Sequence, residues 1–334
     1  MLKKLALVAI VAASSITTSF AADKMNGAGA TFPAPIYYDW AFNYKKDTKN
    51  LVNYQSIGSG GGVKQIAQRT VNFGASDESV SPLKLAKDNL FQFPAVIGSI
   101  VVAFNVDGIA DETLKLKNEV VADIFAGKIT MWNDPAIAAD NQGINLPNQK
   151  ITVVRRSDGS GTTFNFTYYL SQVSKNWKEN YGTGKAVDWP VGIGGKGNEG
   201  VTSLIKQTPY SLGYIENAYK EKNNLSAAVL QTANGKWVTA TEENFKAAAK
   251  YANWTKEQHF HSVLALQAGD TSYPIVAATF ILLPREGGEM NKKVTAFFDY
   301  AFKNGDESAK KLGYIPLPQE TKKMIREYWA ANLK

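Results

Sequence analysis

The sequence contains no cysteine and only two histidines among its 334 residues. Without cysteine, the chain has no disulfide bonds, no thiolate metal ligands and no cysteine nucleophile. The histidines, His259 and His261, are separated by one residue and lie far along the chain from its glycine-rich loops. We interpret them as packed or surface side chains rather than as a two-histidine metal site. Since no dense cluster of carboxylates accompanies them, we expect no metal and no other cofactor.

Long apolar runs and clusters of positive charge are also missing. Beyond the N-terminus, no segment has about 18 consecutive apolar residues, the length that spans a bilayer, so we expect no insertion into a membrane. Lysines and arginines give the chain a formal charge of +7, but they are dispersed rather than gathered in runs. This pattern argues against a nucleic-acid-binding protein. A mild basic excess attracts anions over long range but does not identify one.

The N-terminal segment has the pattern of a secretory signal peptide. Lys3 and Lys4 precede a short apolar stretch at Leu5–Val11, and Ser19–Ala21 offers small residues at the positions that specify cleavage. This predicts removal of residues 1–21. The formal charge then falls from +7 to +5, because two lysines leave with the segment. With no cysteine to carry a lipid anchor, we expect the mature protein to be free in solution outside the cytoplasm.

Strand and helix patterns alternate along the remaining chain, which is typical of an α/β protein with parallel or mixed sheets. Strands are predicted at Leu51–Gln55, Val71–Ala75, Ile97–Asn105, Ile151–Val154 and Ile275–Leu283. The length of the chain favours two domains of about 150 residues each. Two of the strands, Ile97–Asn105 and Ile275–Leu283, would carry the chain out of one domain and back. We therefore expect one domain from residues 22–103 with 278–334, and the other from residues 104–277.

Three segments combine glycines and hydroxyl side chains immediately before a predicted helix. They are Gly27–Pro33, Ile57–Gly62 and Arg156–Thr162. A helix start leaves about four N–H groups without partners inside the helix and carries partial positive charge, so it suits an anion. The hydroxyls could instead be simple N-caps. Three such loops, one of them containing an arginine, favour a shared oxyanion site.

Each of these loops leads into a segment with helical periodicity. After the first loop, Ile36, Trp40 and Tyr44 form an i, i+4, i+8 stripe. The second is predicted to be a tight loop at Gly58–Gly62 before a helix over Val63–Arg69. The third precedes an aromatic-rich helix.

A further glycine pattern, Gly192–Gly197, matches the G-x-G-x-x-G fingerprint of dinucleotide-binding proteins, with Glu216 about 20 residues further on. The fingerprint requires a preceding buried strand, but here it follows Asp188–Pro190. We interpret it as a flexible loop before a helix. The sequence also has no phosphate-binding loop of nucleotide triphosphatases and no G-x-S-x-G, so a nucleotide-dependent enzyme or a serine hydrolase is not favoured.

Longer motifs extend over nearly the whole mature chain. They are Gly27–Pro35, Asn53–Gln55, Ile57–Ser59, Phe73–Asp77, Phe91–Pro94, Val153–Thr162, Gly194–Asn198 and Thr279–Leu282. In sequence and in order they closely resemble the phosphate-binding proteins of bacterial phosphate ABC transporters. The number of long motifs makes this resemblance more specific than any single glycine pattern. One departure is Gly60, where relatives often carry a second serine. Because Ser59 is retained, we expect little consequence.

The resemblance implies a two-domain periplasmic binding protein fold of type II, with sheets flanked by helices, two hinge crossings and the ligand in the interdomain cleft. It implies a monomeric, non-enzymatic protein of the periplasm. Such a protein binds inorganic phosphate and delivers it to the permease and ATPase complex of an ABC transporter. It also implies the residues that contact phosphate: Thr31, Phe32 (through its N–H), Ser59 and Asp77 from the first domain, and Arg156, Ser160, Gly161 and Thr162 from the second.

Among these groups Asp77 is the exception, because all the others donate hydrogen bonds. An ionised carboxylate can only accept, so it must bond a proton that phosphate still carries. Sulfate has none at neutral pH, and a buried acceptor without a partner costs roughly 1–3 kcal/mol, more when charged. We therefore expect Asp77 to reject sulfate. Arg156 supplies the full positive charge, and Asp158 could pair with it and orient it without contacting phosphate.

Two alternative functions stay open from the residues. The first is a binding protein for another oxyanion, such as sulfate or molybdate, against which the acceptor Asp77 argues. The second is a secreted phosphatase or a nucleotide-dependent enzyme. Against it stand the missing activated nucleophile, the missing metal cluster and the remote histidines.

Overall fold

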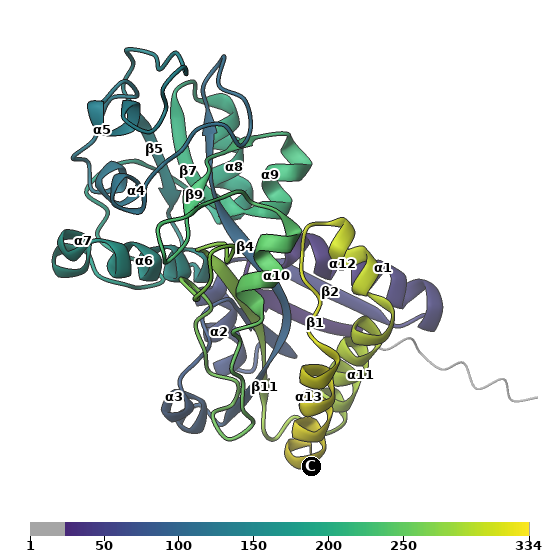
Figure 1. Ribbon diagram of the computed structural model, residues 1–334. Helices are drawn as coiled ribbons and strands as arrows, with labels where there is room; N and C mark the ends of the chain where they lie inside the picture. The colour runs from purple at the N-terminus through teal and green to yellow at the C-terminus, as the bar shows by residue number, and fades with distance from the viewer. Residues whose placement is uncertain (1–23, 334) are drawn as a thin grey trace, which may run out of the picture.

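Strands from both halves of the chain form a large mixed sheet with helices packed around it (Figure 1). The computed structural model describes residues 24–333. The predicted signal peptide, residues 1–21, lies outside the described residues. Within the described part, none of the helices combines the length and the apolar character needed to cross a bilayer.

The main sheet has nine strands in the order β2-β1-β3-β11-β4-β7-β5-β6, with β8 also paired to β4. Their bounds are β1 Lys24–Gly29, β2 Leu51–Ser56, β3 Phe73–Ser76, β4 Leu90–Asn105, β5 Thr152–Arg156, β6 Ile193–Gly195, β7 Ser211–Glu216, β8 Ser226–Ala227 and β11 Val276–Pro284. A small separate sheet pairs β9, Leu230–Gln231, with β10, Trp237–Val238. Pairs among β1, β2 and β3, and among β5, β6 and β7, are parallel, whereas β4 and β11 run antiparallel to their neighbours. The predicted α/β class with a mixed sheet is confirmed.

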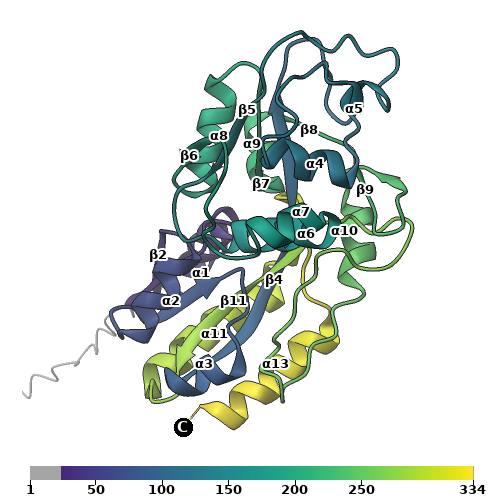
Figure 2. The same cartoon turned by 90° about the vertical axis from the view of Figure 1, so that its left-hand side faces the viewer.

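The helices fall into two groups along the sheet. Around the β2-β1-β3-β11 end lie α1 Ala34–Thr48, α2 Ser59–Ala67, α3 Pro82–Lys87, α11 Gly288–Asn304, α12 Asp306–Lys311 and α13 Gln319–Asn332. Around the β7-β5-β6 end lie α4 Asn118–Phe125, α5 Pro135–Ala138, α6 Gly161–Val173, α7 Lys175–Asn180, α8 Gly197–Gln207 and α9 Asn217–Asn223. The remaining helix, α10 at Glu242–Ala249, lies near the junction of the two groups (Figure 2).

One long strand, β4, joins the two ends of the sheet. Its first part pairs with β11, and its last part, Ile100–Asn105, pairs with β7. Sequence patterns predicted only Ile97–Asn105, because Gln92 and Pro94 interrupt the apolar run. The pairing register shifts between Thr279 and Phe280, opposite Pro94. Such an irregularity leaves one position without a hydrogen bond between the strands, so a proline, which has no N–H to donate, is accommodated there.

The predicted apolar stripe of α1 is buried against the rest of the first group. Ile36, Trp40 and Tyr44 all lie in the core. Trp40 Nε1 donates to the carbonyl of Gly305 at 3.2 Å, which ties α1 to the end of α11. The amphipathic spacing thus places the start of α1, and the loop before it, against the sheet.

Two glycine-rich segments differ from their predicted loop conformation. Of the residues predicted as the tight loop Gly58–Gly62, only Gly58 precedes α2, which already begins at Ser59. A Cβ on Gly62 would lie 2.5 Å from Gly29 Cα, so glycine allows the helix to pack flush against β1. This long-range packing outweighs the low helix propensity of the glycines.

The segment Gly192–Gly197 is likewise not a flexible loop. Ile193–Gly195 forms the edge strand β6, parallel to Val154–Arg156, and α8 begins directly at Gly197. Glycines carry no side-chain pattern, so pairing to a distant strand could not be recognised from the sequence.

Candidate functional site

The starts of α2 and α6 meet at the end of β3. The Ser59 hydroxyl accepts hydrogen bonds from the backbone N–H of Gly161 at 3.0 Å and of Asp77 at 3.2 Å. It donates to Asp77 Oδ2 over 3.4 Å. All three residues are buried. Two helix N-termini from opposite ends of the sheet therefore converge on one buried carboxylate.

Glycine at position 161 permits this close approach. A Cβ there would lie 2.6 Å from Ser59 Oγ and 2.7 Å from the backbone nitrogen of Asp77. Asn165, one turn along α6, donates from Nδ2 to the carbonyls of Asp77 at 2.7 Å and Gly161 at 2.9 Å. This amide fastens the helix start to the end of β3.

The environment of Asp77 disfavours its charged form. Burial raises the pKa of Asp77 to about 7, although the Thr279 hydroxyl, the Arg156 charge and the Ser59 hydroxyl act in the opposite direction. By hydrogen-bond geometry, Asp77 Oδ1 has no partner among the described residues, and neither has the Thr279 hydroxyl. A buried acceptor of this kind calls for a donor from a bound molecule or for its own proton.

A second cluster surrounds Arg156, whose side chain is 1% exposed. Its Nε donates to Asp158 Oδ1 at 2.7 Å and its Nη2 donates to Asp158 Oδ2 at 2.6 Å. Its Nη1 reaches the hydroxyl of Thr162 at 3.4 Å. Burial alone would raise the pKa of Asp158, but the hydrogen bonds and charge of Arg156 hold it below its ordinary value. The arginine is thus charged, buried and held in one orientation.

The loop between β1 and α1 brings Thr31 and Phe32 to the same region. Tyr219 donates through its hydroxyl to the carbonyl of Thr31 at 2.6 Å, and Tyr314 donates to the carbonyl of Phe32 at 2.6 Å. The Thr31 hydroxyl is 2.8 Å from Asn198 Nδ2, and this amide also lies 3.1 Å from the Thr162 hydroxyl. Thr31 is thereby linked to the cluster around Arg156.

Ser160 has a capping role in this arrangement. Its hydroxyl accepts from the backbone N–H of Thr163 at 3.0 Å and so caps α6. The simple cap, which the sequence left as an alternative for such hydroxyls, is therefore present here. Its O–H proton is still free to donate to another group.

Two asparagines of the site were not recognised from the sequence. Asn165 lies inside α6 among aromatic residues, and Asn198 follows the glycines that were interpreted as a loop. The only available signal for Asn198 was its place at the end of the motif Gly194–Asn198.

Each of the two histidine rings lies within hydrogen-bond distance of a hydroxyl group. His259 Nδ1 is 2.5 Å from the Tyr328 hydroxyl, and His261 Nδ1 is 2.8 Å from the Ser79 hydroxyl. Across residues 24–333, no group of three or more potential ligands is placed to hold a metal ion.

Glu216, the acidic residue of the dinucleotide hypothesis, is fully buried and caps a helix. Its Oε2 accepts from the N–H of Ala218 at 2.7 Å at the start of α9. Burial raises the pKa of Glu216 well above its ordinary value. Its other oxygen, Oε1, has no hydrogen-bond partner among the described residues.

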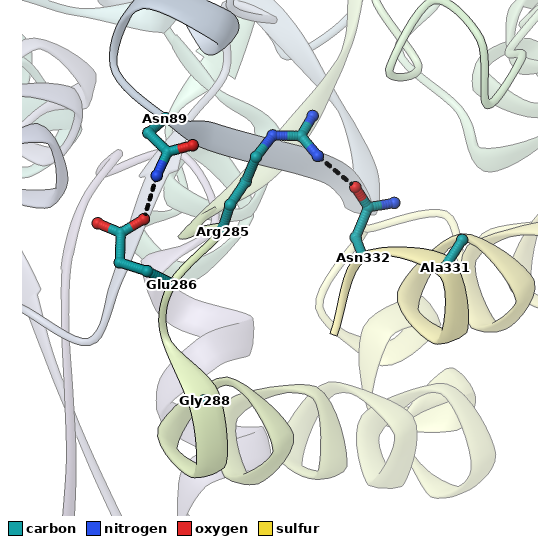
Figure 3. A pocket seen from close by; sticks show the side chains of 6 residues that line it. All are labelled: Asn89, Arg285, Glu286, Gly288, Ala331 and Asn332. Carbon is teal, nitrogen blue, oxygen red and sulfur yellow. Dashed lines mark hydrogen bonds between the residues drawn. The ribbon is translucent and has the colours of Figure 1, made fainter. Parts of the chain in front are cut away.

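A surface pocket of about 440 Å³ lies at the far end of the first helix group (Figure 3). Arg285 projects into it but donates from Nη1 to Asn332 Oδ1 at 2.6 Å. The carboxylate of Glu286 lines the same pocket and accepts from Asn89 at 2.5 Å. A paired arginine beside a carboxylate is a poor anion site, so the buried clusters remain the candidate site.

The fold and this enclosed, donor-rich site agree with what the chain resembles in sequence. A family model described as PBP superfamily domain matches residues 14–304, so the chain is a member of the PBP superfamily. A phosphate-binding protein PstS from Pasteurella multocida is 50% identical over 337 residues, covering 100% of this chain and 97% of the relative. The PstS protein of Haemophilus influenzae is 48% identical over 315 residues, covering 94% of each chain. The protein belongs to the family of PstS phosphate-binding proteins, which confirms the predicted resemblance.

A solved structure shows that the fold is shared. A high-affinity periplasmic phosphate-binding protein with bound phosphate superposes with a TM-score of 0.72 at 19% identity, over 91% of this chain and 93% of that chain. The predicted periplasmic binding protein fold of type II is therefore confirmed.

Proposed function

We propose that the protein binds inorganic phosphate in the periplasm and hands it to an ABC transporter for import, without chemical turnover. The observation that carries this proposal is the position of Asp77, a buried carboxylate with a free acceptor atom between the starts of α2 and α6. Arg156 provides the compensating positive charge. Membership of the family of PstS phosphate-binding proteins supports the binding of phosphate. The motif resemblance to the binding proteins of bacterial phosphate ABC transporters supports delivery to a transporter.

The residues proposed to contact phosphate are those that the sequence suggested: Thr31, Phe32, Ser59, Asp77, Arg156, Ser160, Gly161 and Thr162. The hydroxyls, backbone N–H groups and guanidinium donate to the anion oxygens. Asp77 accepts the proton that phosphate retains at neutral pH. A fully deprotonated tetrahedral dianion offers Asp77 no proton and is therefore excluded.

We further propose that the two ends of the sheet are domains that close over phosphate, with residues 22–103 and 278–334 in one and most of 104–277 in the other. Contacts between them include Ser56 Oγ to Glu199 Oε1 at 2.8 Å and the backbone N–H of Gly60 to the carbonyl of Gly159 at 2.8 Å. These hydrogen bonds must break when the cleft opens.

One segment argues for a revised boundary. Lys256 pairs with Glu327 of α13 at 2.8 Å, and the ring of Phe260 lies 5.2 Å from that of Tyr328, also in α13. We therefore assign residues 256–262 to the first domain, which moves the return crossing upstream of them.

Calorimetry of the mature protein, freed of bound phosphate, tests the proposal. We expect saturable binding of one phosphate per chain and no displacement by excess sulfate. A protein that does not bind phosphate, or that binds sulfate equally well, would overturn the assignment. Incubation with p-nitrophenyl phosphate distinguishes a binding protein from a phosphatase. A phosphatase would release nitrophenol faster than a heat-denatured control, and we expect no such release.

A further inference from the structure

Asn198, at the start of α8, is a fully buried residue with every polar group engaged. Its Nδ2 donates to the hydroxyl of Thr31 at 2.8 Å and to that of Thr162 at 3.1 Å. Its backbone N–H donates to the same Thr31 oxygen at 3.0 Å. Its Oδ1 accepts from the backbone N–H of Glu216 at 2.9 Å.

The orientation of this amide follows from its partners. The backbone N–H of Glu216 can only donate, so the Asn198 atom that faces it must be the acceptor Oδ1. The NH₂ group must then face the two threonine hydroxyls. Turning the amide over would leave a donor opposite a donor in a buried site.

This orientation determines what the threonine hydroxyls can do. A hydroxyl oxygen has two acceptor positions and one proton to donate. The Thr31 oxygen accepts from both the N–H and the Nδ2 of Asn198, which occupies its two acceptor positions. The Thr162 oxygen accepts from Asn198 Nδ2 and from Arg156 Nη1. Both hydroxyls are left with donation as their remaining role.

We propose that Asn198 is a positioning residue that forces the hydroxyls of Thr31 and Thr162 to donate to the bound oxyanion. Thr31 comes from one proposed domain and Asn198 from the other, so the control of Thr31 exists only when the cleft is closed. Thr162 belongs to the same proposed domain as Asn198, so its hydroxyl is oriented in the open state as well. The inference rests on the proposed phosphate function, and it makes Asn198 a selector for ligands whose oxygens at these two places are pure acceptors. Asn198 acts through the threonines and need not contact the anion itself.

A double-mutant cycle with Thr31 tests the inference. We expect Asn198→Ala to weaken phosphate binding by about tenfold, mainly through faster dissociation, because Asn198 meets Thr31 only in the closed state. In a Thr31→Val background, the same substitution should cost about threefold or less, because the hydroxyl it orients is gone. Asn198→Asp keeps the shape and the acceptor for Glu216 but reverses the polarity toward both hydroxyls, so its loss should exceed that of the alanine variant.

A matched control removes the side-chain amide of Asn105, a residue of β4 that contacts the C-terminal end of α8. Asn105 Nδ2 donates to the carbonyl of Ile205 at 2.9 Å, so Asn105→Ala disturbs the end of this helix without touching the threonines. It should leave the phosphate dissociation rate unchanged. An equal loss from Asn198→Ala in both backgrounds, or no loss from either Asn198 variant, would overturn the inference. If instead the wild type fails to bind phosphate, the proposed function fails first, and the two failures are thereby distinguished.

Discussion

Asp158 forms a bidentate ion pair with Arg156, in which Nε donates to Oδ1 at 2.7 Å and Nη2 donates to Oδ2 at 2.6 Å. The same carboxylate accepts from the backbone N–H of Gly197 at 3.0 Å, so it also ties the arginine to the start of α8. Only Nη1 of the guanidinium points to Thr162. The arginine is thereby pre-oriented, which reduces the entropy lost when it binds an anion.

Replacing Asp158 with asparagine tests the role of this ion pair in phosphate binding. We expect phosphate affinity to fall by about tenfold, because the guanidinium loses its charged partner and its fixed orientation. The salt dependence of the affinity should become steeper, since the site gains one net positive charge. Calorimetry over a range of salt concentrations measures both. Asp88→Asn, which breaks the surface pair with Lys84 (2.7 Å), is the control. Unchanged affinity and salt dependence in Asp158→Asn would show that the pair has no part in binding.

Asp77→Asn should relax the discrimination against sulfate. The amide can turn its NH₂ toward an oxygen that carries no proton, so the penalty for sulfate disappears. We expect the preference for phosphate over sulfate to drop on the order of 100-fold. Competition calorimetry with both anions measures the ratio. Asp123→Asn, which removes a carboxylate paired with Lys128 on the surface, should leave the ratio unchanged. The hypothesis is wrong if sulfate still fails to compete and phosphate affinity is unaffected.

The same substitution should change how stability depends on pH. Burial raises the pKa of Asp77 to about 7 in the folded protein, against about 3.9 in an unfolded chain. Between these values the folded state binds the extra proton, so this group's contribution to stability is lost as pH rises through about 7. The loss amounts to about 4 kcal/mol in the closed arrangement.

The asparagine of the variant does not titrate. The free energy of unfolding of Asp77→Asn, taken relative to that of the wild type, should therefore increase between about pH 4 and about pH 7. Above about pH 8 the difference should be constant. Urea unfolding of both proteins without phosphate, at several pH values, measures this difference. A difference that does not vary with pH would mean that Asp77 keeps an ordinary pKa.

Gly161→Ala should obstruct closure of the cleft. The added methyl group would lie 2.6 Å from Ser59 Oγ, so the start of α6 could not approach β3. We expect phosphate affinity to fall on the order of 100-fold, because the closed arrangement that binds phosphate is obstructed. The matched control is Gly159→Ala, whose Cβ would meet its nearest neighbour, Gly60 Cα, at 3.3 Å. Equal affinity of the two variants would mean that this close approach is not needed for binding.

The sequence was sufficient for the chemistry of individual segments. The spacing of Ile36, Trp40 and Tyr44 predicted a helix with one buried face, and the structure has it. The apolar run Ile275–Leu283 predicted the strand β11 to within one residue at each end. Hydrophobic periodicity is a local property, and local properties can be read from neighbouring residues.

Glycine-rich segments were the weak point of the prediction. Gly60 to Gly62 became helical and Ile193–Gly195 became a strand, because packing on β1 and pairing with β5 decided their conformation. Glycine has little intrinsic preference, so its conformation follows from distant contacts. The resemblance supplied the predicted site residues, including Asp77, but it assigned no role to Asn165 or Asn198.

By itself, the sequence determined which groups the protein can offer: hydroxyls, N–H groups at helix starts, one arginine in a glycine-rich loop and no thiol. The tertiary structure alone decided how those groups are used. Thr31, Thr162 and Asn198 are far apart along the chain, yet their hydrogen bonds settle which hydroxyls must donate. A hydroxyl can either donate or accept, so its role depends on the neighbours that folding brings to it.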